Sequence, residues 1–245
     1  MTGPRPAATV LITGGTGGLG RATATAIAAA RRELTVVLTG RDASAAASVA
    51  GRISAETGGD VRGLPLDLGS LDDVRRFGKE LVAAPLPPLH AVLCNAGTQS
   101  VSGTARTADG FERTFGVNHL AHFLLVRELL PHLVAPARIV FVASGTHDPA
   151  KRTGMPAPRY TTAAELADPA VDSAPGAEEP GAAERRAEEP GAPGRPAAEP
   201  GNAATIGRRY YTTSKLCNVL TTYELARRLP AERPGELITV NAFDP

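Results

Sequence analysis

The stretch Thr13-Gly14-Gly15-Thr16-Gly17-Gly18-Leu19-Gly20 decides the fold of this chain. It follows a short apolar run, residues 8–13, that is typical of a β-strand, and it opens a run with helical periodicity, residues 18–31. Glycines at such a junction let the backbone turn tightly and approach a pyrophosphate, whose charge the N-terminus of the helix stabilises. The loop therefore predicts a dinucleotide site. Its candidate cofactor-binding residues are Thr13, Gly14, Thr16, Gly18, Leu19 and Gly20.

Strand-like and helix-like runs alternate along the rest of the chain. Strict alternation predicts βαβ units in one parallel sheet with helices on both faces, a doubly wound, Rossmann-like α/β fold. Residues 138–143 are nearly continuously apolar, as expected for a strand buried on both faces. We expect a single domain over residues 1–245. The predicted strands are residues 8–13, 34–39, 61–66, 89–95, 138–144 and 237–243, and the predicted helices are residues 18–31, 43–57, 70–83, 109–133 and 210–229.

The composition limits the classes of function. Hydrophobic residues make up 42% of the chain and charged residues 21%, as in an ordinary globular protein. The formal net charge of +1 gives no general attraction to nucleic acid or anionic lipid. No apolar run approaches the roughly 18 residues of a membrane span, and no secretory signal is recognisable. With 2 cysteines no disulfide framework can form, so we expect a reduced, cytoplasmic protein with small-molecule partners; homo-oligomerisation is left open.

Residues 168–202 interrupt the alternation. Ala-Glu-Glu-Pro-Gly-Ala occurs at residues 177–182 and again at 187–192, and no large apolar residue recurs with the repeat. Such a segment cannot bury enough surface to offset the entropy of ordering it. We therefore predict a disordered, low-complexity insertion. It is interpreted either as a neutral expansion or as an acidic tether for a partner.

The second predicted strand ends at Thr39-Gly40-Arg41-Asp42. In dinucleotide folds the end of this strand meets the adenosine ribose, where a carboxylate binds a free 2′-hydroxyl and a guanidinium binds a 2′-phosphate. Arg41 therefore favours NADP(H). The alternative is that Arg41 and Asp42 are solvated residues at the start of a helix, with Asp42 as its N-cap.

A tyrosine and a lysine four residues apart, Tyr211 and Lys215, lie near the start of the last predicted helix. Positions i and i+4 share one face of a helix, so the phenol and the ammonium can enter the same cleft. An ammonium beside a phenol stabilises the phenolate, as general acid–base catalysis demands. Tyr210 precedes the pair, but its i+4 partner is Ser214, so Tyr211 is the candidate catalytic residue.

With these motifs the sequence resembles the short-chain dehydrogenase/reductase family over nearly its whole length outside residues 168–202. The matching stretches are the loop at residues 13–20, Asp67-Leu68, Asn95-Ala96-Gly97, Asn118, Ser144 and the pair Tyr211 and Lys215. The resemblance implies that Asp67 contacts the adenine. It also places Leu68 and the floor residues Asn95, Ala96 and Gly97 in the cofactor site.

The same resemblance implies roles for four catalytic residues. Ser144 would hydrogen-bond the substrate oxygen, and Tyr211 would pass it a proton. Lys215 would bind the nicotinamide ribose and tune Tyr211, while Asn118 would anchor a proton-relay water. The implied activity is NADP(H)-dependent interconversion of a carbonyl and an alcohol. The alternative for Ser144 is a strand-end serine, and for Asn118 a helical asparagine with local hydrogen bonds.

Within the family, residues 118–125 and 214–218 resemble the branch of retinol dehydrogenase and light-dependent protochlorophyllide reductase. The resemblance to the reductase is favoured by Cys94, Cys217 and residues 143–149. Reduction of a carbon–carbon double bond is therefore an alternative activity. For both cysteines the other interpretation is a small apolar side chain that fills space.

His119 and His122 are three residues apart on a predicted helix, but no carboxylate or cysteine completes a metal site, so we assign no metal. The chain ends at residues 241–245, where the family continues with a substrate lid, a helix and a seventh strand. The resemblance therefore leads us to expect a missing C-terminal part. A catalytically impaired homologue that acts as a dinucleotide-binding module is the second hypothesis.

Overall fold

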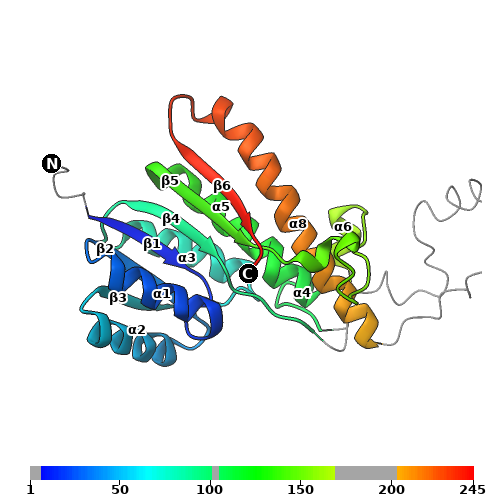
Figure 1. Ribbon diagram of the computed structural model, residues 1–245, viewed down its shortest axis with the longest axis horizontal. Helices are drawn as coiled ribbons and strands as arrows, with labels where there is room; N and C mark the ends of the chain where they lie inside the picture. The colour runs from blue at the N-terminus through cyan, green and yellow to red at the C-terminus, as the bar shows by residue number, and fades with distance from the viewer. Residues whose placement is uncertain (1–6, 101–104, 169–202) are drawn as a thin grey trace, which may run out of the picture.

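The sheet of this protein has six parallel strands in the order β3-β2-β1-β4-β5-β6 (Figure 1). The computed structural model describes residues 7–100, 105–168 and 203–245. The strand order reverses between β1 and β4, which creates the topological switch point where open α/β sheets bind ligands. The strands are β1 (Ala8–Ile12), β2 (Leu34–Gly40), β3 (Asp60–Pro65), β4 (Leu89–Cys94), β5 (Leu133–Val142) and β6 (Ile238–Phe243).

Helices cover the two faces of the sheet, as the sequence predicts. On one face α1 and α2 pack against Val10 and Ile12 of β1, and on the other α3 and α5 pack around Leu11. Neighbouring residues of one strand therefore belong to two separate cores. The long helix α8 runs beside β6 (Figure 1). The helices are α1 (Gly18–Ala30), α2 (Ala43–Thr57), α3 (Leu71–Ala83), α4 (Arg113–Phe115), α5 (Ala121–Leu129), α6 (Ala163–Ala167) and α8 (Ala203–Glu232).

Local signals fix the ends of the second helix. The Asp42 carboxylate accepts a hydrogen bond from the Ala45 backbone N–H at 2.6 Å and so caps α2. Gly58, with φ of 71°, ends the helix in the left-handed conformation that favours glycine. The N-cap interpretation of Asp42 is therefore confirmed.

The helix predicted over residues 109–133 forms, but it starts only at Arg113 and is not a regular α-helix throughout. The chain forms α4, a π-helical turn over Gly116–Leu120, α5 and a 3-10 turn over Leu130–His132, and then enters β5 at Leu133. Gly110, with φ of 86°, lies in the turn before α4 and accounts for the later start of the helix. The Glu112 carboxylate accepts hydrogen bonds from the N–H groups of Thr114 and Phe115 and so caps the start of α4. Further corrections are the early start of β5, the longer α8, which includes Pro230, and the unpredicted α6.

The predicted insertion lies outside the described residues except for Asp168, so its disorder stays a prediction. Asp168 itself has a defined place, because it ends α6 and its carbonyl accepts a hydrogen bond from the Tyr210 hydroxyl at 3.5 Å. In the part of the chain that the structure describes, no helix is both long and apolar enough to cross a lipid bilayer.

Candidate active site

A cleft of about 850 Å³ lies at the carboxyl edge of the sheet, beside the switch point between β1 and β4. The loops that follow β1, β2, β4 and β5 line it together with the first half of α8. It brings together most of the residues predicted from the sequence. These are Gly14, Thr16, Leu19, Gly20, Arg41, Asp67, Leu68, Asn95, Ala96, Gly97, Ser144, Tyr211 and Lys215. The predicted residues Thr13, Gly18 and Asn118 do not line the cleft.

Glycines in the loop after β1 shape one wall of the cleft. A Cβ atom on Gly14 would lie 2.9 Å from the Ala96 side chain, and one on Gly20 would lie 2.4 Å from the Gly14 carbonyl oxygen. Gly17 is different: it lines the cleft, and a Cβ there would meet nothing within 4 Å. Its bare Cα therefore leaves room beside the N-terminus of α1, where a phosphate would fit. Gly17 lies in the predicted loop but is absent from the predicted residues.

Thr13 supports the cleft from below. Its hydroxyl oxygen accepts hydrogen bonds from the backbone N–H groups of Asn95 at 2.9 Å and Ala96 at 3.0 Å. The Asn95 side-chain nitrogen in turn donates a hydrogen bond to the Thr13 carbonyl oxygen at 2.8 Å. These bonds tie the end of β1 to the end of β4, so Thr13 positions the floor residues without touching the cleft.

Arg41 and Asp67 stand on the exposed rim of the cleft. Because the Asp42 side chain caps α2, Arg41 is the charged residue after β2 that faces the cleft. One carboxylate oxygen of Asp67 accepts a hydrogen bond from the Gly69 N–H at 2.8 Å, which shapes the turn before α3. Leu68 is buried beside it.

Tyr211 and Lys215 project from α8 into the opposite side of the cleft. The Lys215 ammonium lies 5.5 Å from the centroid of the Tyr211 ring and donates a hydrogen bond to the Val142 carbonyl at 2.8 Å. Burial lowers the pKa of Lys215 to about 8, because an ammonium loses hydration there. Tyr210, by contrast, is buried in the core. The structure therefore places Tyr211, and not Tyr210, in the cleft.

Ser144 follows β5 and begins a 3-10 turn at the same edge. The Thr146 hydroxyl donates to Ser144 Oγ at 3.1 Å. Asp244, at the end of β6, holds this turn: its carboxylate accepts hydrogen bonds from the Gly145 N–H at 2.7 Å and the Lys151 ammonium at 2.8 Å. The Lys151 ammonium and the Gly145 N–H hold the pKa of Asp244 below its usual value. Asp244 lines the cleft, and sequence reasoning missed it.

Asn118 lies in the π-helical turn, fully buried between the cleft and α8. Its side-chain oxygen accepts from the Thr98 N–H at 2.7 Å, and its side-chain nitrogen donates to Ser214 Oγ at 3.1 Å. Its carbonyl oxygen accepts from His122 Nδ1 at 3.1 Å and from the Asn218 amide at 3.3 Å. Asn118 therefore connects the loop after β4 to α8, beneath the catalytic candidates.

Comparison with known proteins decides the family. The family model described as short chain dehydrogenase matches residues 8–161. The chain belongs to the short-chain dehydrogenase family. The members of this oxidoreductase family bind a nicotinamide dinucleotide, which agrees with the glycine loop at the switch point.

This short-chain dehydrogenase is 34% identical to polyprenol dehydrogenase of Homo sapiens over 249 residues, which cover 99% of the chain and 61% of that protein. It is 36% identical to chloroplastic protochlorophyllide reductase B of Hordeum vulgare, covering 95% of the chain and 57% of that protein. Among solved structures, a protein of Mycobacterium paratuberculosis matches with a TM-score of 0.64 and 31% identity, over 96% of this chain and 66% of that one. The chain thus spans about three fifths of these two curated relatives.

The cysteines and histidines of this short-chain dehydrogenase do not line the cleft. Burial raises the pKa of the Cys94 thiol, and it raises the pKa of the Cys217 thiol to about 11, so both thiols stay protonated. His119 Nδ1 faces the Asn218 side-chain oxygen at 3.0 Å, whereas His122 Nε2 faces Thr13. Within residues 7–100, 105–168 and 203–245, no three His, Cys, Asp or Glu residues gather as a metal ion would need.

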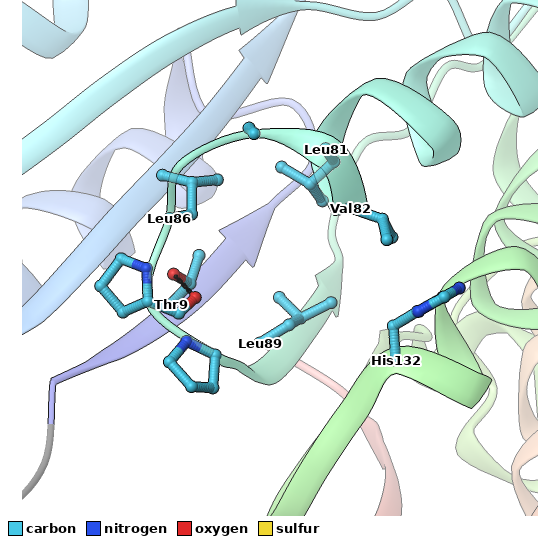
Figure 2. Close-up of a pocket in the computed structure, with 9 residues that line it drawn as sticks. Thr9, Leu81, Val82, Leu86, Leu89 and His132 are labelled. Atoms are coloured by element: carbon cyan, nitrogen blue, oxygen red, sulfur yellow. Dashed lines mark hydrogen bonds between the residues drawn. The ribbon is translucent and has the colours of Figure 1, made fainter.

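A depression of about 200 Å³ lies at the opposite, amino edge of the same sheet (Figure 2). Thr9 of β1, Leu81 and Val82 of α3, and Leu89 of β4 line it, and His132 is the titratable residue in its lining. The described residues that line this depression include no tyrosine, lysine or glycine. The candidate catalytic and cofactor-binding residues therefore gather at the carboxyl edge.

Proposed function

We propose that this short-chain dehydrogenase is an NADP(H)-dependent oxidoreductase that interconverts a carbonyl and an alcohol, with Tyr211 as the group that exchanges the proton. The single observation that carries the proposal is the cleft at the switch point. It holds the phenol and the ammonium of Tyr211 and Lys215 opposite the glycine loop and Arg41.

The residues of the cleft fit a dinucleotide. The open space at Gly17 suits the pyrophosphate, and a volume of about 850 Å³ is within the usual range for a ligand cleft. Arg41 on the rim suits a 2′-phosphate, because a guanidinium forms charge-assisted hydrogen bonds with phosphate oxygens. This supports NADP(H) over NAD(H). When bound, the nicotinamide supplies or accepts the hydride.

The residues of α8 and β5 suit the proton exchange. Ser144 Oγ, at the end of β5, can donate a hydrogen bond to the substrate oxygen and orient it toward Tyr211. The phenol of Tyr211 makes no hydrogen bond with the residues that the structure describes, so it is available to a substrate. Lys215, held by the Val142 carbonyl, would stabilise the phenolate that forms and bind the ribose. Asn118 does not line the cleft and its carbonyl oxygen already accepts two hydrogen bonds, so it would hold the loop after β4 against α8 and not anchor a relay water.

The alternative activities have less support. A role of Cys94 in a protochlorophyllide-type reduction is not favoured, because that thiol is buried and does not line the cleft. A binding module without catalysis would not require the pair Tyr211 and Lys215. The two free cysteines agree with the proposed reducing, cytoplasmic setting.

The test is a screen of NADPH consumption with aldehydes and ketones of increasing chain length, including retinal and polyprenals, each compared with NADH. The relatives named as polyprenol dehydrogenase motivate the long isoprenoid substrates. We expect at least one carbonyl to be reduced faster with NADPH than with NADH. Binding of NADPH without turnover of any carbonyl would support the binding-module hypothesis instead.

A further inference from the structure

His122 of α5 is a completely buried titratable side chain that the proposed reaction does not use. Its ring lies between two parts of the site. Nε2 is 2.8 Å from the Thr13 hydroxyl oxygen, and Nδ1 is 3.1 Å from the Asn118 carbonyl oxygen. A buried polar ring of this kind requires hydrogen-bond partners, and the two partners here belong to the cofactor floor and to the catalytic network.

The partners of His122 decide which ring nitrogen carries the proton. The Asn118 carbonyl can only accept, so Nδ1 must donate to it. A neutral ring then has an unprotonated Nε2, which accepts a hydrogen bond from the Thr13 hydroxyl. Burial lowers the pKa of His122 to about 4, with smaller effects from the charges of Lys215 and His119, so the neutral ring is present at pH 7.

This arrangement also satisfies every hydrogen-bonding site of the Thr13 hydroxyl. A hydroxyl has one hydrogen to donate and two lone pairs that accept. The N–H groups of Asn95 and Ala96 use the two lone pairs, and His122 takes the hydrogen, in preference to the Leu93 carbonyl at 3.3 Å. If His122 donated through Nε2 instead, three donors would compete for two lone pairs.

We propose that His122 is a positioning residue for the cofactor floor. By accepting the hydrogen of Thr13, it orients that hydroxyl to hold the amides of Asn95 and Ala96 beside the glycine loop. By donating to the Asn118 carbonyl, it holds the π-helical turn that carries the catalytic network. The inference rests on the proposed function of the cleft as a dinucleotide site.

Two substitutions of His122 test the two hydrogen bonds of its ring separately. His122→Asn keeps a donor near the Asn118 carbonyl but cannot reach Thr13, whereas His122→Gln can place an acceptor near Thr13. Thr13→Val removes the hydroxyl without changing the shape of the side chain. Thr9→Val is the matched control, because Thr9 is buried in β1, the strand that leads to Thr13, and its hydroxyl donates to the Pro87 carbonyl at 2.7 Å, far from the cleft.

The affinity for NADPH is measured by fluorescence titration of each variant, together with its thermal midpoint. We expect His122→Asn and Thr13→Val each to weaken binding by about tenfold, and their combination to weaken it little further, because both break one interaction. His122→Gln should recover most of the affinity, and Thr9→Val should change only the thermal midpoint. If His122→Asn fails to fold, Thr13→Val alone and combined with His122→Gln carry the test.

Nitrogen NMR of histidine-labelled protein at pH 7 reads the tautomer directly, and we expect Nδ1 of His122 to be protonated and Nε2 unprotonated. A proton on Nε2, unchanged NADPH affinity in His122→Asn, or losses that add in the double variant would each overturn the proposal. If the parent protein and His122→Asn bind NADPH equally well, the role of His122 is refuted but the proposed function is not. A parent protein that binds neither NADPH nor NADH refutes the proposed function.

Discussion

Thr9 lies near the start of β1 and Thr13 directly follows its end, and both are buried, yet their surroundings differ. At the amino end, the Thr9 hydroxyl donates to one carbonyl, that of Pro87, beside the depression of Figure 2. At the carboxyl end, the Thr13 hydroxyl contacts His122 and the amides of Asn95 and Ala96, below the cleft. The same residue type therefore has a packing role near the start of β1 and supports a site just after its end.

The difference follows from the direction of the strands. In a parallel sheet every strand ends at the same edge, where the following helices present their N-termini and unpaired N–H groups. The loop after β1, the rim after β2 and the turn after β5 therefore converge on one cleft. The opposite edge receives helix C-termini, and here Pro87 and Pro88, which have no N–H groups, precede β4.

The largest effect we expect comes from Tyr211→Phe. Removing the phenol hydroxyl should lower turnover by about 10²–10⁴-fold, as for loss of a general acid, while NADPH affinity stays nearly unchanged. Steady-state kinetics and fluorescence titration check the two quantities. Tyr210→Phe is the control, because that ring is buried in the core, and its turnover should match the parent. Full turnover in Tyr211→Phe would refute the mechanism.

Arg41→Ala should have a smaller and more selective effect. If the guanidinium binds the 2′-phosphate, the parent protein prefers NADPH to NADH by about 1–3 kcal/mol, and the variant loses most of that preference. Titration with both nucleotides measures it. Arg52→Ala, on the exposed surface of α2, should keep the parent preference. Equal affinities of the parent for both nucleotides would remove Arg41 from the cofactor site.

A pH-dependent difference in stability should identify Lys215 as the buried ammonium of the cleft. Its pKa is about 8 in the folded protein, against 10.5 for a hydrated lysine such as that of the unfolded chain, so the unfolded chain binds more protons between these values. The contribution of Lys215 to the stability of the nucleotide-free protein should therefore rise with pH across that range, whereas the buried thiols of Cys94 and Cys217, whose pKa values are raised from 9.0, oppose it at the upper end. Lys215→Met should lose this rise and bind NADPH more weakly. Urea unfolding at several pH values measures this effect. The same dependence of the unfolding free energy on pH in both proteins would contradict the prediction.

A substitution at the amino edge should have little effect on stability or function. His132→Ala, at the depression of Figure 2, should change stability by less than about 0.5 kcal/mol and leave NADPH affinity and turnover unchanged. The same titration and unfolding experiments measure it. A clear loss of turnover would mean that both edges contribute to function.

The sequence predicts the fold wherever the signals are local. The helix predicted over residues 43–57 forms as α2 with the same bounds, because Asp42 and Gly58 mark its ends. The helix predicted at residues 109–133 starts later than predicted and contains an unpredicted π-helical turn, which depends on distant partners. Asn118 in that turn bonds Thr98 and Ser214, which local periodicity cannot reveal.

The same distinction holds for the candidate site. The glycine loop and the pair Tyr211 and Lys215 have a recognisable spacing and meet in one cleft. Asp244 and His122 have no such spacing, because Asp244 contacts Gly145 at a separation of 99 residues and His122 contacts Thr13 at 109. A carboxylate directly after the last predicted strand was the one available signal for Asp244, since all strand ends meet at that edge.

The most direct test of the dinucleotide site is the NADPH affinity of Gly17→Val. Gly17 has φ of −155°, an extended conformation that valine adopts, and its Cβ would enter open space, so the variant should fold as the parent does. The added side chain would occupy the position proposed for the pyrophosphate. We expect NADPH affinity to fall by at least about 100-fold, roughly 3 kcal/mol, with an unchanged thermal midpoint. Parent-like NADPH affinity in a folded Gly17→Val protein would contradict the assignment of the carboxyl-edge cleft as the cofactor site.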